Sequence, residues 1–493
     1  MSRLHVSRPA GALALTVASV ALSVCGGSTS AAPPSDWPAP NGDLAGTRAG
    51  HGAIDAANVT RLRVLWRFRL RGPTTFSGLA SATPLIVGRR VYVQDLRSNV
   101  YALDRQTGRL VWERRFDRVD GGPNGVAFAD GRLFGNTDVS TFALDARSGR
   151  VLWLRRLTTT REPITIAPAV ARGVVVTSTT GPFPGGRGTI VGLDAGTGRV
   201  RWRFDTIAEP WRFPRVASGG GAWGTPTVDA AGHVWVGTAN PDPWGGTRAL
   251  PNGGAYPGPV RWTDSLLELD AATGRLLWAA QVTPHDVRDH DFQDPPVLAG
   301  GLVVGAGKAG RVVAWERSSH RRAWSTAVGL HRNDRGPLPA RPVSVCPGLL
   351  GGIETPLAVA DGRVFVPVVD LCFPESSLGT SETKFLTTDY AAGRGALVAL
   401  DLRTGRRLWT RRLGSPDFGC ATVSNDVVFT STYAGGVLAL EASSGKVLWR
   451  ATAPSAVNAC PAVAGRLLVL PAAATYPRPR IQRPEVVAYA PAA

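Results

Sequence analysis

The sequence has very little lysine and almost no methionine. Its 55 basic residues are nearly all arginine, and the only lysines are Lys308, Lys384 and Lys446. The formal net charge is +18 at pH 7, yet no dense run of basic residues of the kind that marks nucleic-acid binding occurs. We therefore expect no nucleic-acid partner, and the arginine bias fits genome composition at least as well as an anionic partner.

Long hydrophobic runs are missing after the first 25 residues, so no later segment is expected to span a membrane. Residues 1–25 have the layout of a secretory signal, with basic residues, an apolar run and then small residues. The run ends in "LSVCGGS", which resembles a bacterial lipoprotein cleavage box with Cys25 as the lipidated residue, although Val24 stands where a smaller residue is usual. Ordinary signal cleavage near Ala31–Ala32 is the alternative.

Residues 26–36 are rich in glycine, serine, proline and alanine, and they are predicted to form a flexible tether. The remaining chain is therefore expected to be exported to the cell envelope. It would meet a membrane only through a lipid anchor.

An internal repeat supplies most of the pattern in the rest of the chain. The stretch "VYALDRQTGRLVW" (100–112) combines an alternating apolar strand, a tight turn at Thr-Gly and a second strand that ends in tryptophan. Another pair of strands precedes each unit, which gives the four strands of a propeller blade. The tryptophans are expected to pack against the neighbouring blade and to carry no chemistry. The other copies end at Trp153, Trp202, Trp278, Trp324, Trp409 and Trp449.

The spacing of the units predicts the number of blades. Most units are separated by the 40–50 residues that a bare blade needs, and two longer intervals indicate insertions near residues 241–262 and 373–392. The last unit lacks a tryptophan strand, which the orphan strand around Trp66 would supply. We predict an all-β fold, an eight-bladed β-propeller over residues 37–493 whose ring is closed by the N-terminal strand. An open solenoid is the alternative, and the insertions are expected to roof one end of the channel.

Cysteine is scarce as well. Cys25 belongs to the export signal, and four cysteines remain in an oxidising setting. Cys420 and Cys460 occupy matching positions one repeat apart, and Cys346 and Cys372 flank one hairpin, so we favour the pairs 346–372 and 420–460 among the three possible pairings. No Cys-x-x-Cys-His sequence for haem attachment occurs, and no Cys–His arrangement points to a catalytic thiol.

The repeat resembles the pyrroloquinoline quinone (PQQ) repeat, and the chain is most similar to quinoprotein alcohol dehydrogenases. The resemblance implies an eight-bladed propeller that holds PQQ and a metal ion on its axis. Three stretches are more specific than the repeat itself: "GGGAWGTPTVDAAGHVWVGTANPDPW" (219–244), "TPHDVRDHDFQDPPVL" (283–298) and "VCPGLLGGIETP" (345–356). The same repeat also occurs in non-catalytic scaffolds, including an envelope lipoprotein that assists outer-membrane assembly.

The resemblance implies roles for residues that would touch the cofactor. Trp223 would form the flat floor under the quinone, and Thr165 in "TIAP" would hydrogen-bond PQQ. Lys308 in "GAGKAG" corresponds to the basic residue near the quinone oxygens.

Three further residues are implied to bind calcium or a lanthanide, since hard cations prefer oxygen ligands. Asn240 would contribute its amide oxygen. Asp289 would bind the metal and act as the catalytic base that takes the alcohol proton while hydride leaves for the quinone. Asp291 stands where lanthanide-using members carry an extra aspartate.

The chain also departs from the family pattern. Phe183 stands where the family has its first metal ligand, a glutamate. The vicinal cysteine pair that covers the cofactor is absent from "GGPNGVAFADG", and so is the arginine near it. Glu354 replaces an asparagine, and we hypothesise that it returns a carboxylate to the channel. The alternative, structural interpretation of residues 283–293 is a polar loop whose acids cap turns and pair with Arg288. A zinc site at His285 and His290 is a further alternative, but it lacks a third ligand.

Two classes of function follow. The first is an exported PQQ-dependent alcohol dehydrogenase, or a descendant with a partly degenerate cofactor site, acting on a small alcohol and passing electrons to a separate acceptor. The second is a non-catalytic envelope scaffold that binds a protein or an anionic polymer. A ligand sensor without turnover is disfavoured by the retained Asp289.

Overall fold

The computed structural model describes residues 36–493 apart from residues 51, 74, 76, 257, 380–389, 391–392, 475–482 and 493. The expected signal segment and all but the last residue of the expected tether lie outside the described residues. The chain divides into two units, Met1–Pro33 and Pro34–Ala493, and the second contains every described residue. In this described part, no helix is long and apolar enough to cross a membrane.

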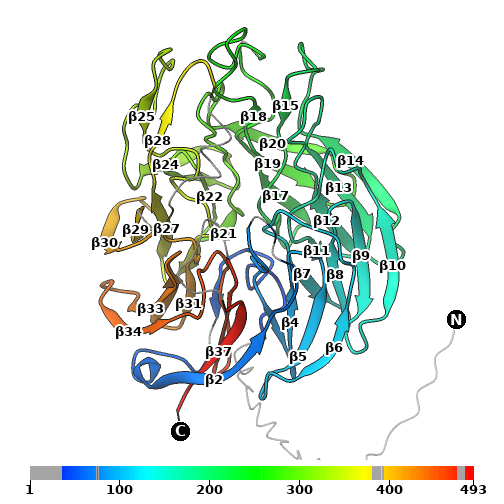
Figure 1. The fold of residues 1–493 in the computed structure, drawn as a ribbon, viewed down its shortest axis with the longest axis vertical. Helices are drawn as coiled ribbons and strands as arrows, with labels where there is room; N and C mark the ends of the chain where they lie inside the picture. The colour runs from blue at the N-terminus through cyan, green and yellow to red at the C-terminus, as the bar shows by residue number, and fades with distance from the viewer. Residues whose placement is uncertain are drawn as a thin grey trace, which may run out of the picture. The chain divides into compact units, whose positions relative to one another are not determined.

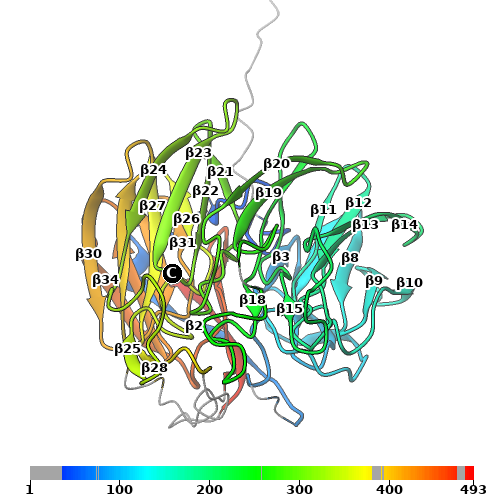
Figure 2. The same ribbon diagram turned by 90° about the horizontal axis from the view of Figure 1, so that it is seen from above.

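The second unit is a ring of eight four-stranded antiparallel sheets, which confirms the predicted propeller (Figures 1 and 2). We number these blades 1 to 8 in chain order. The middle strands of each blade are buried on both faces because each sheet packs between two others, and this explains their continuous apolar sequences.

The first four blades contain sixteen strands. Their bounds are β3 (Leu85–Val87), β4 (Arg90–Gln94), β5 (Val100–Asp104), β6 (Leu110–Arg114), β7 (Val126–Ala129), β8 (Arg132–Asn136), β9 (Ser140–Asp145), β10 (Val151–Arg156), β11 (Ala169–Ala171), β12 (Val174–Ser178), β13 (Thr189–Asp194), β14 (Val200–Asp205), β16 (Thr227–Val228), β17 (His233–Gly237), β19 (Ser265–Asp270) and β20 (Leu276–Gln281).

The last four blades complete the ring. Their strands are β21 (Val297–Ala299), β22 (Leu302–Gly307), β23 (Arg311–Glu316), β24 (Arg322–Ala327), β26 (Ala358–Ala360), β27 (Arg363–Asp370), β29 (Arg394–Asp401), β30 (Arg407–Leu413), β31 (Thr422–Ser424), β32 (Val427–Ser431), β33 (Gly436–Glu441), β34 (Val447–Thr452), β35 (Ala462–Ala464), β36 (Leu467–Ala472), β37 (Glu485–Pro491) and β2 (Leu62–Arg69).

Strands from both ends of the chain close the ring. In blade 8, β2 pairs antiparallel with β37, with Leu62 opposite Pro491 and Arg69 opposite Glu485. Figure 1 shows this pair as a blue strand beside a red one. The short β1 (Ala49–Gly50) adds a parallel partner to β31, and the 3-10 turn η1 (Val59–Arg61) leads into β2. The predicted closure by the strand around Trp66 is therefore confirmed.

The repeated tryptophans pack between blades, as predicted. The ring of Trp66 lies against Gly108 of the next blade, where an added Cβ would come within 2.6 Å of the ring. Gly108 has a φ of +68°, so the turn needs glycine for its backbone as well as for the close contact. Trp66 Nε1 also donates a hydrogen bond to the carbonyl of Arg105 at 2.9 Å. The same arrangement recurs at Trp112 with Gly149.

Both predicted disulfides are present, Cys346–Cys372 and Cys420–Cys460. The remaining strands form two small sheets at the insertions: β15 (Ser218–Gly219) with β18 (Pro241–Asp242), and β25 (Val343–Val345) with β28 (Phe373–Glu375).

Candidate functional site

A cavity of about 570 Å³ collects several of the predicted site residues. Trp223, Asp289, Lys308 and Glu354 all line it. They come from three blades: Trp223 precedes β16, Asp289 lies between β20 and β21, Lys308 follows β22 directly, and Glu354 precedes β26. The ring arrangement therefore brings residues together that are more than 100 positions apart in the sequence.

Local hydrogen bonds fix the acidic segment that contains Asp289. Asp286 accepts hydrogen bonds from the backbone N–H groups of Arg288 at 2.7 Å and His290 at 2.5 Å. Arg288 donates to backbone carbonyls of a neighbouring loop, including that of Asn333 at 2.8 Å. Asp289 adopts a left-handed backbone with a φ of +61°. Asp286 thus caps the turn as the structural interpretation predicted, whereas Asp289 is left to face the cavity.

Lys308 holds two of the predicted carboxylates. Its Nζ lies 2.8 Å from Asp289 Oδ2 and 2.7 Å from Asp291 Oδ2. Asp291 also accepts a hydrogen bond from the backbone N–H of Asn240 at 2.6 Å, so Asn240 lies beside the same pair. Within the described ranges, no group of three or more histidine, cysteine, aspartate or glutamate side chains is arranged to hold a metal ion.

Burial shifts the pKa values of Asp289 and Lys308. It raises the pKa of Asp289 well above its usual value, against the effect of Lys308 and with a further increase from Asp291. Burial alone would lower the pKa of Lys308, but Asp289 and Asp291 outweigh it and hold that pKa well above normal. The ammonium therefore stays charged between its two partners.

Asp264 is a buried carboxyl that the sequence analysis missed. It precedes β19, and its backbone N–H donates to the carbonyl of Ala239, the residue before Asn240, at 3.1 Å. Neither of its carboxyl oxygens has a hydrogen-bond partner. Burial raises its pKa well above normal, and the nearby Asp286 and Asp291 raise it further. No motif marks this position, because only the packing of β17 against β19 brings it to the site.

Two more carboxyls line the cavity. Burial raises the pKa of Glu354 to about 8, against the effect of Lys308. Glu354 Oε1 has no hydrogen-bond partner, while Oε2 accepts a hydrogen bond from Gln293 at 3.3 Å. Asp294, also missed, has an unpartnered Oδ2, and burial followed by Glu354 raises its pKa well above normal. Burial therefore favours the protonated form of both side chains.

Not every predicted residue lines the cavity. Thr165 is buried with an unpartnered Oγ1 and does not line the wall, although Ala167 does. Asn240 and Asp291 lie behind Asp289 and Lys308 and are likewise absent from the lining. Phe183 is 49% exposed and is not among the residues that line the cavity.

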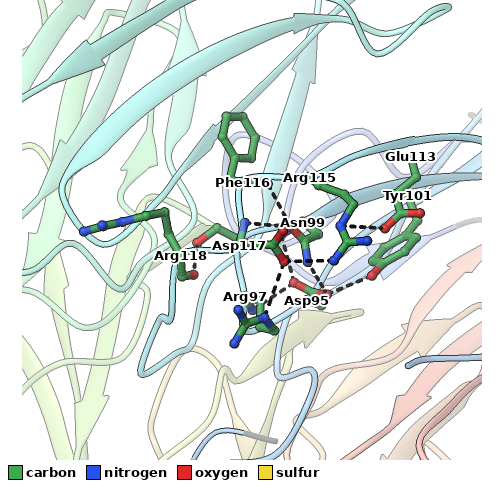
Figure 3. A network of polar contacts seen from close by, with 10 residues as sticks. Asp95, Arg97, Asn99, Tyr101, Glu113, Arg115, Phe116, Asp117 and Arg118 are labelled. Atoms are coloured by element: carbon green, nitrogen blue, oxygen red, sulfur yellow. Dashed lines mark hydrogen bonds and ion pairs between the residues drawn. The ribbon is translucent and has the colours of Figure 1, made fainter. Parts of the chain in front are cut away.

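A polar network around Asp95 and Asn99 (Figure 3) extends through Asn124 to the segment where the family carries its vicinal cysteines. Asp95, in the turn between β4 and β5, accepts hydrogen bonds from Asn99 and from the hydroxyl of Tyr101 at 2.9 Å. Asn99 Oδ1 in turn accepts from the backbone of Phe116 at 2.8 Å. Asn124 Nδ2 then donates to the carbonyl of Asp95 at 2.7 Å. These bonds hold residues 121–124 at the cavity wall without a disulfide.

The Cys420–Cys460 disulfide does line the cavity. Its two cysteines immediately precede the first strands of blades 7 and 8. The bond therefore fastens two neighbouring blades at the cavity wall.

Comparison with known families agrees with this geometry. The family model of the glucose/ethanol/alcohol dehydrogenase β-propeller domain, the PQQ family, matches residues 37–315, which is more than half of the chain. The chain belongs to the PQQ β-propeller family. A second PQQ-type model, that of the outer membrane protein assembly factor BamB, matches residues 263–370 and 393–479.

Relatives of this PQQ propeller are distant. A quinohemoprotein alcohol dehydrogenase from Comamonas testosteroni is 27% identical over 86% of this chain and 70% of its own length. A lanthanide-dependent methanol dehydrogenase from Methylacidiphilum fumariolicum (strain SolV) is 25% identical over 85% of this chain and 80% of its own. A solved europium-containing methanol dehydrogenase, 22% identical, superimposes with a TM-score of 0.77 over 93% of this chain and 98% of its own, which supports the fold.

Proposed function

We propose that this PQQ propeller is an exported oxidoreductase that binds a quinone cofactor in the cavity and oxidises an alcohol. The observation that carries the proposal is that Asp289, Lys308 and Trp223 line one cavity. A base, a cation and a flat aromatic ring are protein groups that can orient a quinone and assist proton removal from an alcohol.

The cavity fits a planar, oxygen-rich cofactor. Trp223 offers a ring on which a flat molecule can stack. Ser81 Oγ, Asn124 Oδ1 and Thr355 Oγ1 line the wall and are buried without hydrogen-bond partners, so a polar ligand would satisfy them. Glu354 is protonated at neutral pH and can donate a hydrogen bond to a carboxylate or carbonyl oxygen of PQQ.

The oxygen-bearing side chains near Lys308 are of the types that bind a hard cation. Asp289 and Asp291 provide carboxylates, Asn240 an amide oxygen, and Asp264 a carboxyl without a partner. Calcium and lanthanide ions take such oxygen ligands. A bound cation would supply Lewis-acid polarisation of a cofactor carbonyl. Glu354 lines the cavity and accepts a hydrogen bond from Gln293, and its role as a carboxylate returned to the channel stays a hypothesis.

Asp289 is the base in the proposed reaction. In its ionised form it would accept the hydroxyl proton of the alcohol, and a bound quinone would supply the hydride acceptor needed for a carbonyl product. Lys308 would keep Asp289 oriented through the 2.8 Å contact and stabilise negative charge that develops at the reacting oxygens. The two electrons would pass to a separate acceptor.

A non-catalytic envelope scaffold is the second candidate. The match to the BamB model favours it, and so does the surface position of Phe183, which the resemblance places where the family has its first metal ligand. In this case the protein would bind an envelope protein or, through its net charge of +18, an anionic polymer. Under either function we propose export, with lipidation at Cys25. Two disulfides are typical of an extracytoplasmic protein.

The test is PQQ binding to the chain from residue 36, followed by quenching of tryptophan emission with and without calcium or lanthanum. The proposal predicts saturable quenching that weakens at least about tenfold in Trp223→Leu. Asp289→Asn should retain binding and abolish alcohol-dependent reduction of an artificial acceptor. Saturable binding without any turnover would indicate a sensor, and no binding under any metal condition would favour the scaffold.

A further inference from the structure

Aromatic side chains form one part of the cavity wall. Tyr390, Phe418 and Tyr433 form a triangle with ring centroids 5.6 to 6.2 Å apart. All three are at least 94% buried, and all line the cavity that contains Asp289. Trp244 lines the same cavity and packs against this group. We call these four residues the aromatic wall.

Three of the four residues of the aromatic wall come from segments between blades or in the insertions, and the fourth comes from a turn inside blade 7. Trp244 lies in the first insertion and Tyr390 in the second, so both insertions reach the cavity. Phe418 comes from the connection between blades 6 and 7, and Tyr433 from the turn between β32 and β33. Because none of these positions recurs in the other blades, blade packing alone does not require the wall.

Both disulfides hold this wall in place. Phe418 lies two residues before Cys420, which is bonded to Cys460 on the next blade. Cys346–Cys372 joins two segments that flank the wall, and Phe373 next to it belongs to the same apolar cluster as Tyr390. A wall fixed in this way loses little conformational entropy on binding a ligand, which favours affinity for a rigid apolar guest.

The wall is apolar rather than charged. The cluster that contains it includes Leu349, Leu371 and Val369, and Leu349 also lines the cavity. Methanol or ethanol is too small to contact several rings together. A larger uncharged alcohol can contact several of these rings within the cavity that Asp289 also lines.

We propose that the aromatic wall selects alcohols with a bulky, uncharged apolar body, such as an aromatic or alicyclic ring, over short-chain alcohols. The inference rests on the proposed dehydrogenase function, because that function makes the alcohol hydroxyl the reacting group. Binding itself depends only on the wall and can be measured without a cofactor.

The test compares benzyl alcohol, cyclohexylmethanol, choline and ethanol as ligands of the chain from residue 36, by saturation-transfer NMR and tryptophan emission. The two ring alcohols should bind at least about tenfold more tightly than ethanol or choline. Phe418→Leu should weaken the ring alcohols about fivefold or more. Tyr433→Phe, which keeps the ring, should not change them. Phe183→Leu, at an exposed site outside the cavity, is the matched control.

Equal binding of ethanol and benzyl alcohol would overturn the inference, as would tighter binding of choline or an unchanged affinity in a folded Phe418→Leu variant. PQQ binding measured in parallel separates the two proposals. Ring-alcohol binding without PQQ binding would contradict the proposed dehydrogenase function and leave the aromatic wall as a ligand-binding site. PQQ binding without discrimination among alcohols would contradict the proposed substrate class and leave the proposed dehydrogenase function standing.

Discussion

At the scale of single residues, Lys308 shows why a rare residue type occurs at this position. A compact ammonium on a flexible stem can approach two carboxylates from one point, whereas a planar guanidinium prefers a single bidentate partner. Lys308 contacts Asp289 and Asp291 at 2.8 and 2.7 Å, and both acids are nearly fully buried. The lysine therefore neutralises charge that would otherwise be costly inside the ring.

Removing this ammonium should destabilise the fold. Lys308→Ala leaves two buried acids without their partner, and we expect a loss of about 3–5 kcal/mol in the free energy of unfolding at pH 7. The loss should shrink at lower pH as Asp289, whose pKa burial raises, takes up a proton. Urea titrations at pH 5 and pH 7 measure both effects. Lys446→Ala, at an exposed lysine, is the control and should change nothing.

Asp417 should make stability depend on pH. Burial raises its pKa to about 8, although the Thr430 hydroxyl donates to it at 2.6 Å. The folded state thus holds a proton that the unfolded state releases above about pH 4, so the contribution of Asp417 to stability falls as pH rises toward 8. Asp417→Asn should reduce the decline in unfolding free energy between pH 5 and pH 8. A decline as steep as in the parent chain would show that Asp417 is ionised in the fold.

The positions of site residues could be predicted only where a local stretch resembled the family. This held for Asp289 and Lys308, which do meet at the cavity. Asp264 and Asp294 could not be found in this way. They belong to no repeated pattern, and only the packing of separate blades gives them buried surroundings and raised pKa values.

At the scale of elements, the interface between blades 4 and 5 differs from the other tryptophan–glycine contacts. His320 stands where the other repeats have glycine, with a φ of +57°, and its ring stacks on Trp278 at 4.8 Å. His320 Nε2 lies 2.7 Å from buried Glu268, whose other oxygen lies 2.8 Å from His233 Nδ1. Glu268 takes the place of the small residue found in other blades. The two substitutions therefore compensate each other across the interface.

This compensation predicts strong coupling between the two positions. His320→Gly alone removes a partner of buried Glu268 and should cost about 1–3 kcal/mol of unfolding free energy. His320→Gly combined with Glu268→Ala restores the pattern of the other blades and should recover most of that loss. A double-mutant cycle by urea denaturation measures the coupling. Additive losses would mean that the two residues stabilise the interface independently.

At the scale of the whole molecule, Arg48 ties the N-terminal segment to the last blades. Its guanidinium donates to the carbonyls of Ala421 at 2.8 Å, Pro461 at 2.7 Å and Pro40 at 2.9 Å. The side chain is fully buried, and burial lowers its pKa to about 9. The residue therefore links blades 7 and 8 to the start of the described chain.

Lysine cannot reach these carbonyls together, because it has one nitrogen. Arg48→Lys should therefore lower the unfolding free energy by about 2–4 kcal/mol through unpaired buried acceptors. Thermal and urea unfolding measure it. Arg109→Lys, at an exposed arginine, serves as the control. An unchanged midpoint for Arg48→Lys would mean that other donors satisfy the carbonyls.

The propeller ring could be predicted because the repeat determines the number and order of its blades. The period, the orphan strand around Trp66 and the matching positions of Cys420 and Cys460 all follow from one pattern that recurs along the chain. The two insertions belong to no repeating sequence pattern. Their contribution to the cavity through Trp244 and Tyr390 depends on where long loops settle, which no local periodicity encodes.

Closure of the ring also sets an order on folding. β2 and β37 are more than 400 positions apart, so β2 has no partner in blade 8 until the last strand has been made. Contacts of such large sequence separation form slowly, and a partial ring exposes an unpaired strand edge that can aggregate. The chain is therefore vulnerable during synthesis, and a complete, still unfolded chain held by a chaperone is the state from which the ring can close safely.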